Sequence, residues 1–182
     1  MILVLSTYRT GSTNLCKSLA EERGYENLDE CFHESLIDQH KDVLRYILKN
    51  PNCVIKIFPY HLEKSNIDNL FNQLVEIAEQ VIILIRKDFD SQVKSYYTCK
   101  QIGDWHSDFE DTVDILLDKD KFLWCTNFLH NQYLEILNLK RKLSDYKLLY
   151  THQLDQKNKY QRPTKWNRQP GFTNIDIEEL FV

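Results

Sequence analysis

Residues 2–13 have the sequence Ile2-Leu3-Val4-Leu5-Ser6-Thr7-Tyr8-Arg9-Thr10-Gly11-Ser12-Thr13. The stretch Ile2–Ser6 is a short, nearly continuous apolar run, which is typical of a buried β-strand. A polar turn with a single glycine follows, and residues 14–23 then have the composition of a helix that ends at Gly24. A strand that passes through such a turn into a helix is a typical unit of an α/β fold.

The same alternation continues along the chain. Further strands are expected at Cys53–Phe58, Val81–Ile85 and Tyr146–Tyr150. Helices are expected at Leu36–Leu48, from a cap at Ser65 or Asn66 to about Glu79, at Phe89–Gln101, which Gly103 closes, and at Phe109–Leu143, with a break near Asp118–Asp120. Residues 155–172 predict a loop, and a short helix is expected over Ile175–Phe181. The sequence therefore predicts one α/β domain with a central parallel sheet covered by helices on both faces.

Composition excludes several classes of protein. The 182 residues fit a single domain, and 42% hydrophobic with 27% charged residues is ordinary for a globular protein. A net charge of −4 argues against a nucleic-acid partner. The chain shows no signal-peptide pattern and no apolar run as long as a membrane span. Its five cysteines are scattered and never spaced Cys-x-x-Cys, so we expect reduced thiols, a cytoplasmic location and no zinc site.

The turn after the first strand has the features of an anion-binding loop. Backbone N–H groups converge at the start of a helix, and Gly11 allows a ligand to approach the backbone closely. Ser12 and Thr13 add hydroxyl donors, and Arg9 supplies positive charge. The loop lacks the Gly-Lys-Ser/Thr of a nucleoside-triphosphate P-loop. A plain polar turn is the alternative.

A second candidate anion site follows the strand Val81–Ile85. Arg86 can make paired hydrogen bonds to a phosphate, and Ser95 on the next helix can add a hydroxyl to the same oxygens. The alternatives are that Arg86 pairs with Asp88 or Asp90 and that Ser95 is an ordinary helix residue.

These segments resemble those of sulfotransferases, above all the small bacterial type that acts on trehalose. The stretch Ser6–Leu15 is similar to that family's 5′-phosphosulfate loop. The pattern Arg86-x-Asp88-x-x-x-Gln92-x-x-Ser95 resembles its 3′-phosphate segment, and Gln101-Ile102-Gly103-Asp104-Trp105 resembles its Gln-x-Gly-x-Trp stretch. The late basic stretch Lys159–Arg168 matches, in position, a loop that closes over the nucleotide in this family; a solvated basic loop is the alternative.

The resemblance implies a P-loop nucleoside-kinase-like three-layer fold and a donor, 3′-phosphoadenosine 5′-phosphosulfate (PAPS). It implies no metal and a hydroxyl acceptor, which we expect to be a carbohydrate or another small molecule. The donor would leave as adenosine 3′,5′-bisphosphate (PAP). The nucleotide-binding residues that it implies are Arg9, Thr10, Gly11, Ser12, Thr13, Asn14, Arg86, Ser95, Lys165 and Arg168. Arg9 would also act in catalysis, near the bridging oxygen.

Two residues are candidates for the general base that sulfonate transfer requires. Glu30 resembles the glutamate of a Glu-aromatic-Phe turn in the trehalose type, with Cys31 in place of the aromatic residue. His61 follows a strand, as does the catalytic histidine of the cytosolic sulfotransferases, and a histidine is a competent base near neutral pH. Lys56 could reach the sulfonate or simply flank the strand.

Other interpretations of the sequence stay open. A small-molecule kinase that uses ATP and magnesium would share the fold, as would a nucleotide-binding protein without turnover. The pattern of helix packing is shown by Phe122, Trp124, Phe128, Tyr133 and Leu137. The sequence does not identify the acceptor or the oligomeric state.

Overall fold

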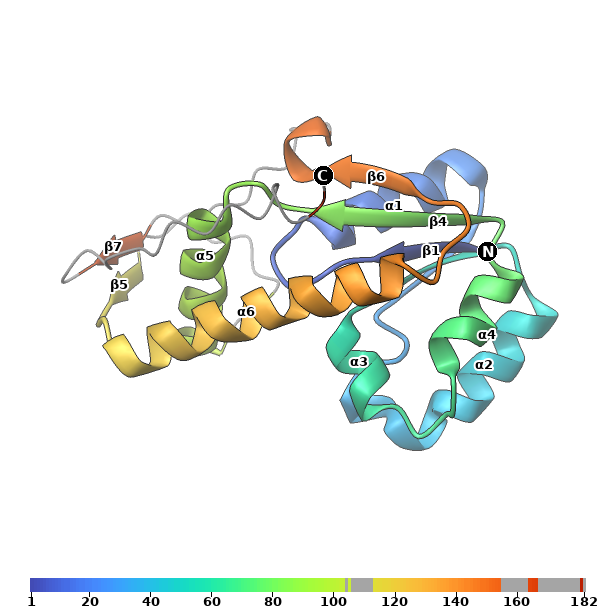
Figure 1. Cartoon of the computed structure of the whole chain (residues 1–182), viewed down its shortest axis with the longest axis horizontal. Helices are drawn as coiled ribbons and strands as arrows, with labels where there is room; N and C mark the ends of the chain where they lie inside the picture. Colours follow the sequence, from blue (N-terminus) through green and yellow to red (C-terminus); the bar gives the residue numbers. More distant parts are fainter. Residues whose placement is uncertain (104, 106–112, 155–163, 167–180, 182) are drawn as a thin grey trace.

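The fold is known from a computed structural model, which describes residues 1–103, 105, 113–154, 164–166 and 181. Its centre is a parallel sheet of five strands in the order β2-β3-β1-β4-β6 (Figure 1). The strands are β1 (Ile2–Leu5), β2 (Glu26–Asp29), β3 (Cys53–Ile57), β4 (Gln80–Ile85) and β6 (Lys147–Tyr150). The predicted parallel sheet is therefore confirmed.

Alternate residues of the central strands pack into two separate cores. In β1, Ile2 and Val4 face a core shared with α1 (Ser12–Arg23), whereas Leu3 and Leu5 face the opposite core. That opposite core is covered by α2 (His40–Lys49), α4 (Leu70–Ile77) and α6 (Lys119–Lys140), and buried residues of the helix Phe89–Ile102 join it. The strands are apolar on both faces because helices cover both, as the sequence predicted for a three-layer α/β fold.

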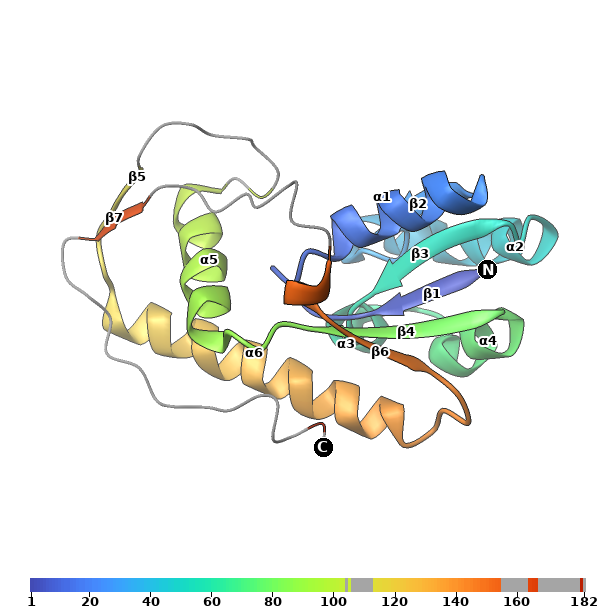
Figure 2. The same cartoon turned by 90° about the horizontal axis from the view of Figure 1, so that it is seen from above.

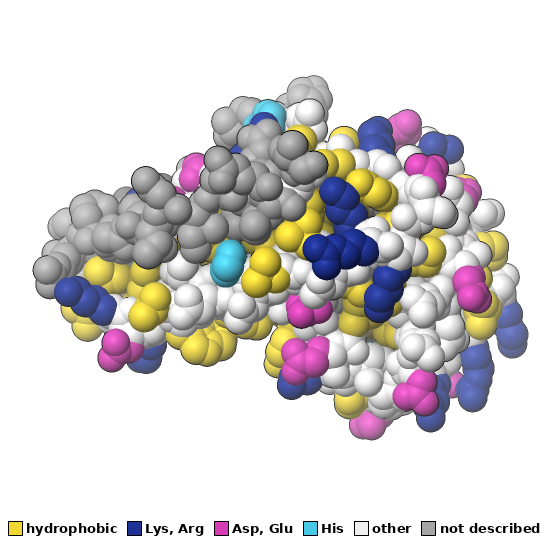
Figure 3. Space-filling view, in the orientation of Figure 1, with side chains coloured by type: hydrophobic (Ala, Val, Ile, Leu, Met, Phe, Trp, Pro, Cys, Tyr) yellow, Lys and Arg dark blue, Asp and Glu magenta, His cyan; other side chains and the backbone are white. Residues whose placement is uncertain are grey.

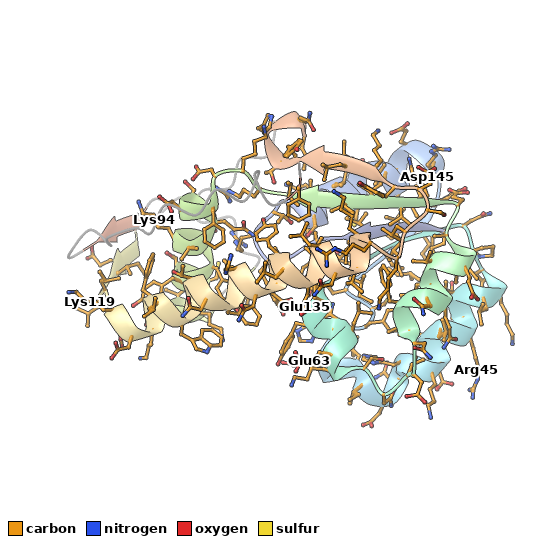
Figure 4. All side chains as sticks on the ribbon, viewed as in Figure 1. Arg45, Glu63, Lys94, Lys119, Glu135 and Asp145 are labelled. Carbon is orange, nitrogen blue, oxygen red and sulfur yellow. The ribbon has the colours of Figure 1, made fainter. Side chains whose placement is uncertain are left out.

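Smaller elements extend the molecule beyond the sheet. Helix α5 (Phe89–Ile102) follows β4 and packs on α6, and the short parallel pair β5 (Val113–Ile115) and β7 (Thr164–Trp166) lies beyond α5 (Figures 1 and 2). Among the labelled side chains of Figure 4, Lys94 and Lys119 lie at this end, and Arg45 and Asp145 lie at the other. The remaining elements are α3 (Pro59–Lys64) and two 3-10 helices, η1 (Glu34–Gln39) and η2 (Thr151–Gln153).

Several predicted elements agree closely with the structure. Helix α1 ends at Gly24 and α5 ends at Gly103, and both glycines adopt the left-handed conformation of a helix C-cap. The break predicted near Asp118–Asp120 is the start of α6, where the Asp118 side chain accepts the N–H groups of Asp120 and Lys121.

Other elements differ, and each difference has a local cause. Strand β2 was not predicted because Glu26–Asp29 is polar, as an exposed edge strand can be. Pro59 ends β3 but also begins α3, since proline fits the first turn of a helix. The helix predicted from Leu36 is divided into η1 and α2. Helix α4 starts later than predicted, after Asn69, whose φ is 54°.

Two parts of the sequence interpretation are only partly covered. The helix predicted from Phe109 is instead a strand at Val113–Ile115, while residues 109–112 lie outside the described part of the chain. The helix predicted over 175–181 also lies outside it, apart from Phe181.

The five cysteines are free and buried. Burial raises the pKa of the Cys16 and Cys31 thiols to about 12, so both are protonated core residues. Over the ranges that the structure describes, none of the helices has the length and apolar character needed to cross a bilayer.

Candidate active site

The predicted site residues that the structure describes, with the exception of Ser95 in the middle of α5 and Lys165 in β7, lie after strands of the same sheet or at the start of the helix that follows. Because these strands are parallel, the loops that follow them start at a single edge (Figure 1). Arg9 follows β1, Glu30 follows β2, His61 follows β3 and Arg86 follows β4. Ligands of open α/β sheets bind at this carboxyl edge.

The loop after β1 is shaped by two residues in the left-handed region. Arg9 has φ 62° and Gly11 has φ 82°, and α1 begins directly afterwards at Ser12. The buried Thr10 hydroxyl donates to the Thr7 carbonyl at 3.0 Å, which closes the turn. The first N–H groups of α1 have no acceptor within the helix, so this turn can receive an anion, and the exposed Thr13 can add its hydroxyl.

The two predicted anion segments are bonded to each other. Arg86 Nη1 donates to the Arg9 carbonyl at 3.1 Å, and Arg9 Nε donates to Ser95 Oγ at 2.8 Å. Arg9 Nη1 also donates to the Trp105 carbonyl at 3.0 Å. Ser95 was predicted beside Arg86; in this structure its hydroxyl bonds to Arg9, although it belongs to the same cluster.

Arg86 is held in place by its backbone as well as by its side chain. Its N–H donates to Tyr133 Oη at 3.1 Å. Burial lowers the pKa of Arg86, but a guanidinium stays protonated at neutral pH. The carboxylate of Asp88, its alternative partner, caps α5 by accepting Ser91 N–H at 3.0 Å. The charged guanidinium of Arg86, with its several N–H donors, therefore lies beside the loop after β1.

A buried lysine lies on the other side of that loop. Lys56 is in β3, and its side chain is only 2% exposed. Its Nζ lies 2.5 Å from Thr13 Oγ1, 2.9 Å from an Asp29 oxygen and 2.8 Å from Glu30 Oε1. Burying an ammonium is costly unless it is fully paired, and here two carboxylates and a hydroxyl surround it.

Glu30 and His61, the two candidate bases, are neighbours. His61 Nε2 lies 3.7 Å from Glu30 Oε2. His61 is fully buried, which lowers its pKa to about 3, and its Nδ1 accepts the Phe58 N–H at 3.3 Å. A neutral imidazole whose Nδ1 accepts a hydrogen bond carries its proton on Nε2. His61 therefore has no free lone pair with which to take a proton from a substrate hydroxyl. The side chain of Glu30 is 23% exposed, and the arrangement favours it as the base.

Glu30, His33 and His61 also bring three potential metal-ligand atoms within 4.8 Å of one another. His33 Nδ1 accepts the Ser35 N–H at 3.2 Å, so this ring, when neutral, also carries its proton on Nε2. A histidine that binds a metal instead offers a bare nitrogen and donates from the other one. The two histidine Nε2–H groups can therefore donate to a carboxylate such as that of Glu30, and they are less suited to binding a divalent cation.

Tyr8 places an aromatic wall next to the anion loop, a role that sequence reasoning missed. Its ring centroid lies 4.6 Å from that of Phe58, 5.3 Å from that of Tyr96 and 5.9 Å from that of Trp105. Burial raises the pKa of the Tyr8 hydroxyl, so it stays protonated. These rings pack on one another and give the loop after β1 an apolar border.

Thr151 also belongs to this edge of the sheet. It follows β6, and its hydroxyl lies 2.7 Å from the Thr10 carbonyl and 3.1 Å from the Ile85 carbonyl. These contacts join the ends of β6 and β4 to the loop after β1.

A cavity of about 320 Å³ lies apart from the predicted residues, between α5 and α6. It is lined by Tyr97, Lys100, Gln101, Lys121, Trp124 and Cys125. The Trp124 ring that borders it already stacks on Phe128 and lies beneath Lys100 Nζ at 4.6 Å. The cavity therefore offers no open aromatic platform to a ligand.

The late basic loop is mostly outside the described residues. Lys165 lies in β7, where it is the register partner of Asp114 in β5, and Arg168 falls in an undescribed range. The predicted closure of residues 159–168 over a nucleotide stays a prediction.

Comparison of the chain with protein-family models gave no match, and comparison with curated proteins gave none either. The resemblance to sulfotransferases therefore stays a prediction, and the function is argued from the site itself.

Proposed function

We propose that this chain transfers a sulfonate group from PAPS to the hydroxyl of a carbohydrate or another small molecule. The observation that carries the proposal is a juxtaposition at one sheet edge. The loop after β1 is bonded to Arg86 on one side, and Thr13 at its end is bonded to Lys56, the partner of Glu30, on the other. Cations for two phosphates thus flank a single turn, with a candidate base next to it.

The finer fold assignment belongs to the same proposal. Strand β1 is central, between β3 and β4, and its loop leads directly into α1. This arrangement supports a P-loop nucleoside-kinase-like architecture.

Each residue has a distinct task in the proposed reaction. The first turn of α1 and Arg9 would hold the 5′-phosphate, and Arg86 would hold the 3′-phosphate. The donor supplies an activated S–O bond, which breaks as the acceptor oxygen forms the new one, its electron pair remaining on the phosphate. Glu30 takes the acceptor's proton, and Arg9 with Lys56 stabilises the charge on the departing phosphate.

The position of Lys56 argues against a magnesium-dependent kinase. In a nucleoside-triphosphate P-loop, the hydroxyl at the start of the helix binds Mg²⁺. Here Thr13 Oγ1 bonds instead to the Lys56 ammonium, a fixed cation. This contact supports a metal-free transfer in which the Lys56 ammonium takes the position that Mg²⁺ has in a kinase.

The charges on one face of the molecule fit a small substrate better than a nucleic acid. On the face shown in Figure 3, acidic and basic side chains are mixed over the half of the molecule that carries α2, α3 and α4. Such a mixed surface does not resemble a nucleic-acid footprint. The cytoplasmic location expected from the cysteines is likewise part of the proposal.

The proposal is tested by ligand protection followed by transfer. PAP should raise the melting temperature, because a ligand that binds only the folded state stabilises it, whereas ATP with magnesium should not. Radiolabelled PAPS, incubated with the chain and a panel of sugars and phenols, should yield a labelled acceptor, and Arg9→Ala should abolish the label.

The other functions predict different results. Protection by ATP with magnesium, and not by PAP, indicates a kinase and contradicts the proposal. Protection by PAP without transfer to any acceptor indicates a nucleotide-binding protein without turnover.

A further inference from the structure

A buried hydrogen-bond chain connects the segment after β4 to the loop after β1. Arg86 N–H donates to Tyr133 Oη at 3.1 Å, and Tyr133 Oη donates to Gln92 Oε1 at 2.7 Å. Gln92 Nε2 then donates to the Tyr8 carbonyl at 2.6 Å. Both side chains in the middle of this chain are fully buried.

The direction of every bond in this chain is fixed by its ends. A backbone N–H can only donate and a carbonyl can only accept, so the hydroxyl of Tyr133 must donate onward and the amide of Gln92 must donate to Tyr8. A flipped Gln92 amide would set its oxygen against the Tyr8 carbonyl. Only one arrangement satisfies all four groups, and a fully satisfied buried polar network specifies a single geometry.

The Tyr133 ring is itself held by packing. It lies in the opposite core from α1, with ring centroids of Phe89 and Phe181 at 6.1 Å and 6.0 Å. Its hydroxyl is therefore presented from α6 at a defined point. The sequence pattern assigned Tyr133 to helix packing. Packing needs only the ring, so it does not explain the hydroxyl.

We propose that Tyr133 and Gln92 are positioning residues that lock the loop after β1 to Arg86, so that a nucleotide's two phosphate groups meet two sites at a fixed separation. The inference rests on the proposed function, because the ligand it concerns is the bisphosphate nucleotide. Neither side chain needs to touch the ligand. When two sites are held at the correct distance, binding one end of a ligand makes binding of the other end nearly intramolecular.

The quantity that reports this locking is the ratio of the dissociation constants of AMP and PAP, called here the advantage of PAP over AMP. AMP occupies the 5′ site alone, whereas PAP occupies both sites. In Tyr133→Phe the buried Arg86 N–H and Gln92 Oε1 lose their partner. The Arg86 side chain still bonds to the Arg9 carbonyl, but the backbone of Arg86 is no longer held to the first loop through this buried chain. We expect the advantage of PAP over AMP, measured by calorimetric titration, to fall about tenfold.

Tyr97→Phe is the matched control. Tyr97 is also buried, and its hydroxyl makes two bonds of the same kind, to the Leu116 carbonyl at 3.0 Å and from the Asp118 N–H at 2.8 Å. These partners precede α6 and belong to neither anion segment. Tyr97→Phe should therefore keep the wild-type advantage to within about twofold, whatever its stability.

Other outcomes overturn the inference. A folded Tyr133→Phe that retains the wild-type advantage contradicts it, while PAP binding to the wild type leaves the proposed function intact. If Tyr133→Phe does not fold, Gln92→Met, which deletes both the oxygen that accepts from Tyr133 and the N–H that donates to Tyr8, must show the same loss. A wild-type chain that does not bind PAP overturns the proposed function, and this coupling with it.

Discussion

At the scale of single residues, the two candidate bases that the sequence left open differ in accessibility. His61 is buried and carries its proton on the nitrogen that faces Glu30, whereas Glu30 is partly exposed. Only the carboxylate is both reachable and able to accept a proton. The chemistry of each side chain was legible in the sequence, but its accessibility is a property of the packed structure.

This difference predicts the effect of two substitutions. Glu30→Gln removes the base while keeping the shape of the side chain, so kcat should fall by about 10²- to 10⁴-fold with little change in donor KM. His61→Asn, whose side-chain oxygen can still accept the Phe58 N–H, should cost less than about tenfold. Steady-state kinetics of the two variants side by side decides the matter. A larger loss in His61→Asn would identify His61 as the base.

His61 also predicts how stability depends on pH. Its pKa is about 3 in the folded protein and near 6.5 in the unfolded chain, so between these values the unfolded state binds a proton that the folded state does not. The free energy of unfolding should therefore fall as the pH drops below about 6.5. From pH 7 to pH 5 this amounts to roughly 1–2 kcal/mol, which His61→Asn should remove.

Urea unfolding at the two pH values measures this effect. His152→Asn, at an exposed position, is the control and should keep the wild-type pH dependence. Equal losses of stability on acidification in His61→Asn and the wild type would show that His61 is not the buried neutral group described above.

At the scale of elements, the turn before α1 and the end of α1 offer a matched pair of glycines. Gly11 has φ 82° and Gly24 has φ 65°, so an alanine at either position is strained by about 1–2 kcal/mol. A Cβ on Gly11 would meet only ordinary contacts, at 3.5 Å and beyond, and one on Gly24 would meet nothing within 4 Å. We expect Gly11→Ala and Gly24→Ala to lose similar stability in thermal unfolding.

Binding should separate these two variants. Gly11→Ala disturbs the backbone that receives the anion and should weaken PAP binding by about tenfold or more, while Gly24→Ala should bind as the wild type does. If both variants bind PAP equally well, the turn before α1 is not the phosphate site.

Elements with strong periodic or capping signals were predictable, and the others were not. The apolar strands and the glycine-terminated helices follow from local pattern, as α1, α5 and β4 show. Strand β2 has no apolar pattern because it is an edge strand, and it forms since β3 offers it a partner. The same limit applies to Lys56: a lysine inside an apolar strand was visible, but not the two carboxylates that pair with it.

At the scale of the whole molecule, parallel topology explains how much of the site could be predicted. Residues that follow parallel strands must share an edge, so Arg9 and Arg86 were expected together without any knowledge of distances. The bonds that join them depend on packing between segments far apart in sequence. Arg9 bonding to Ser95, and Tyr133 to Arg86 and Gln92, are contacts of that kind.

The central claim is that one nucleotide places its two phosphate groups in the loop after β1 and at Arg86. Calorimetric titration of AMP and PAP into the wild type and Arg86→Ala tests it most directly. Arg86→Ala also disturbs the Arg9 carbonyl, so only the ratio of the two affinities is diagnostic. We predict that PAP binds the wild type at least about tenfold more tightly than AMP and that Arg86→Ala abolishes this advantage. Equal affinities for AMP and PAP in the wild type, or an advantage that survives in Arg86→Ala, would contradict the account.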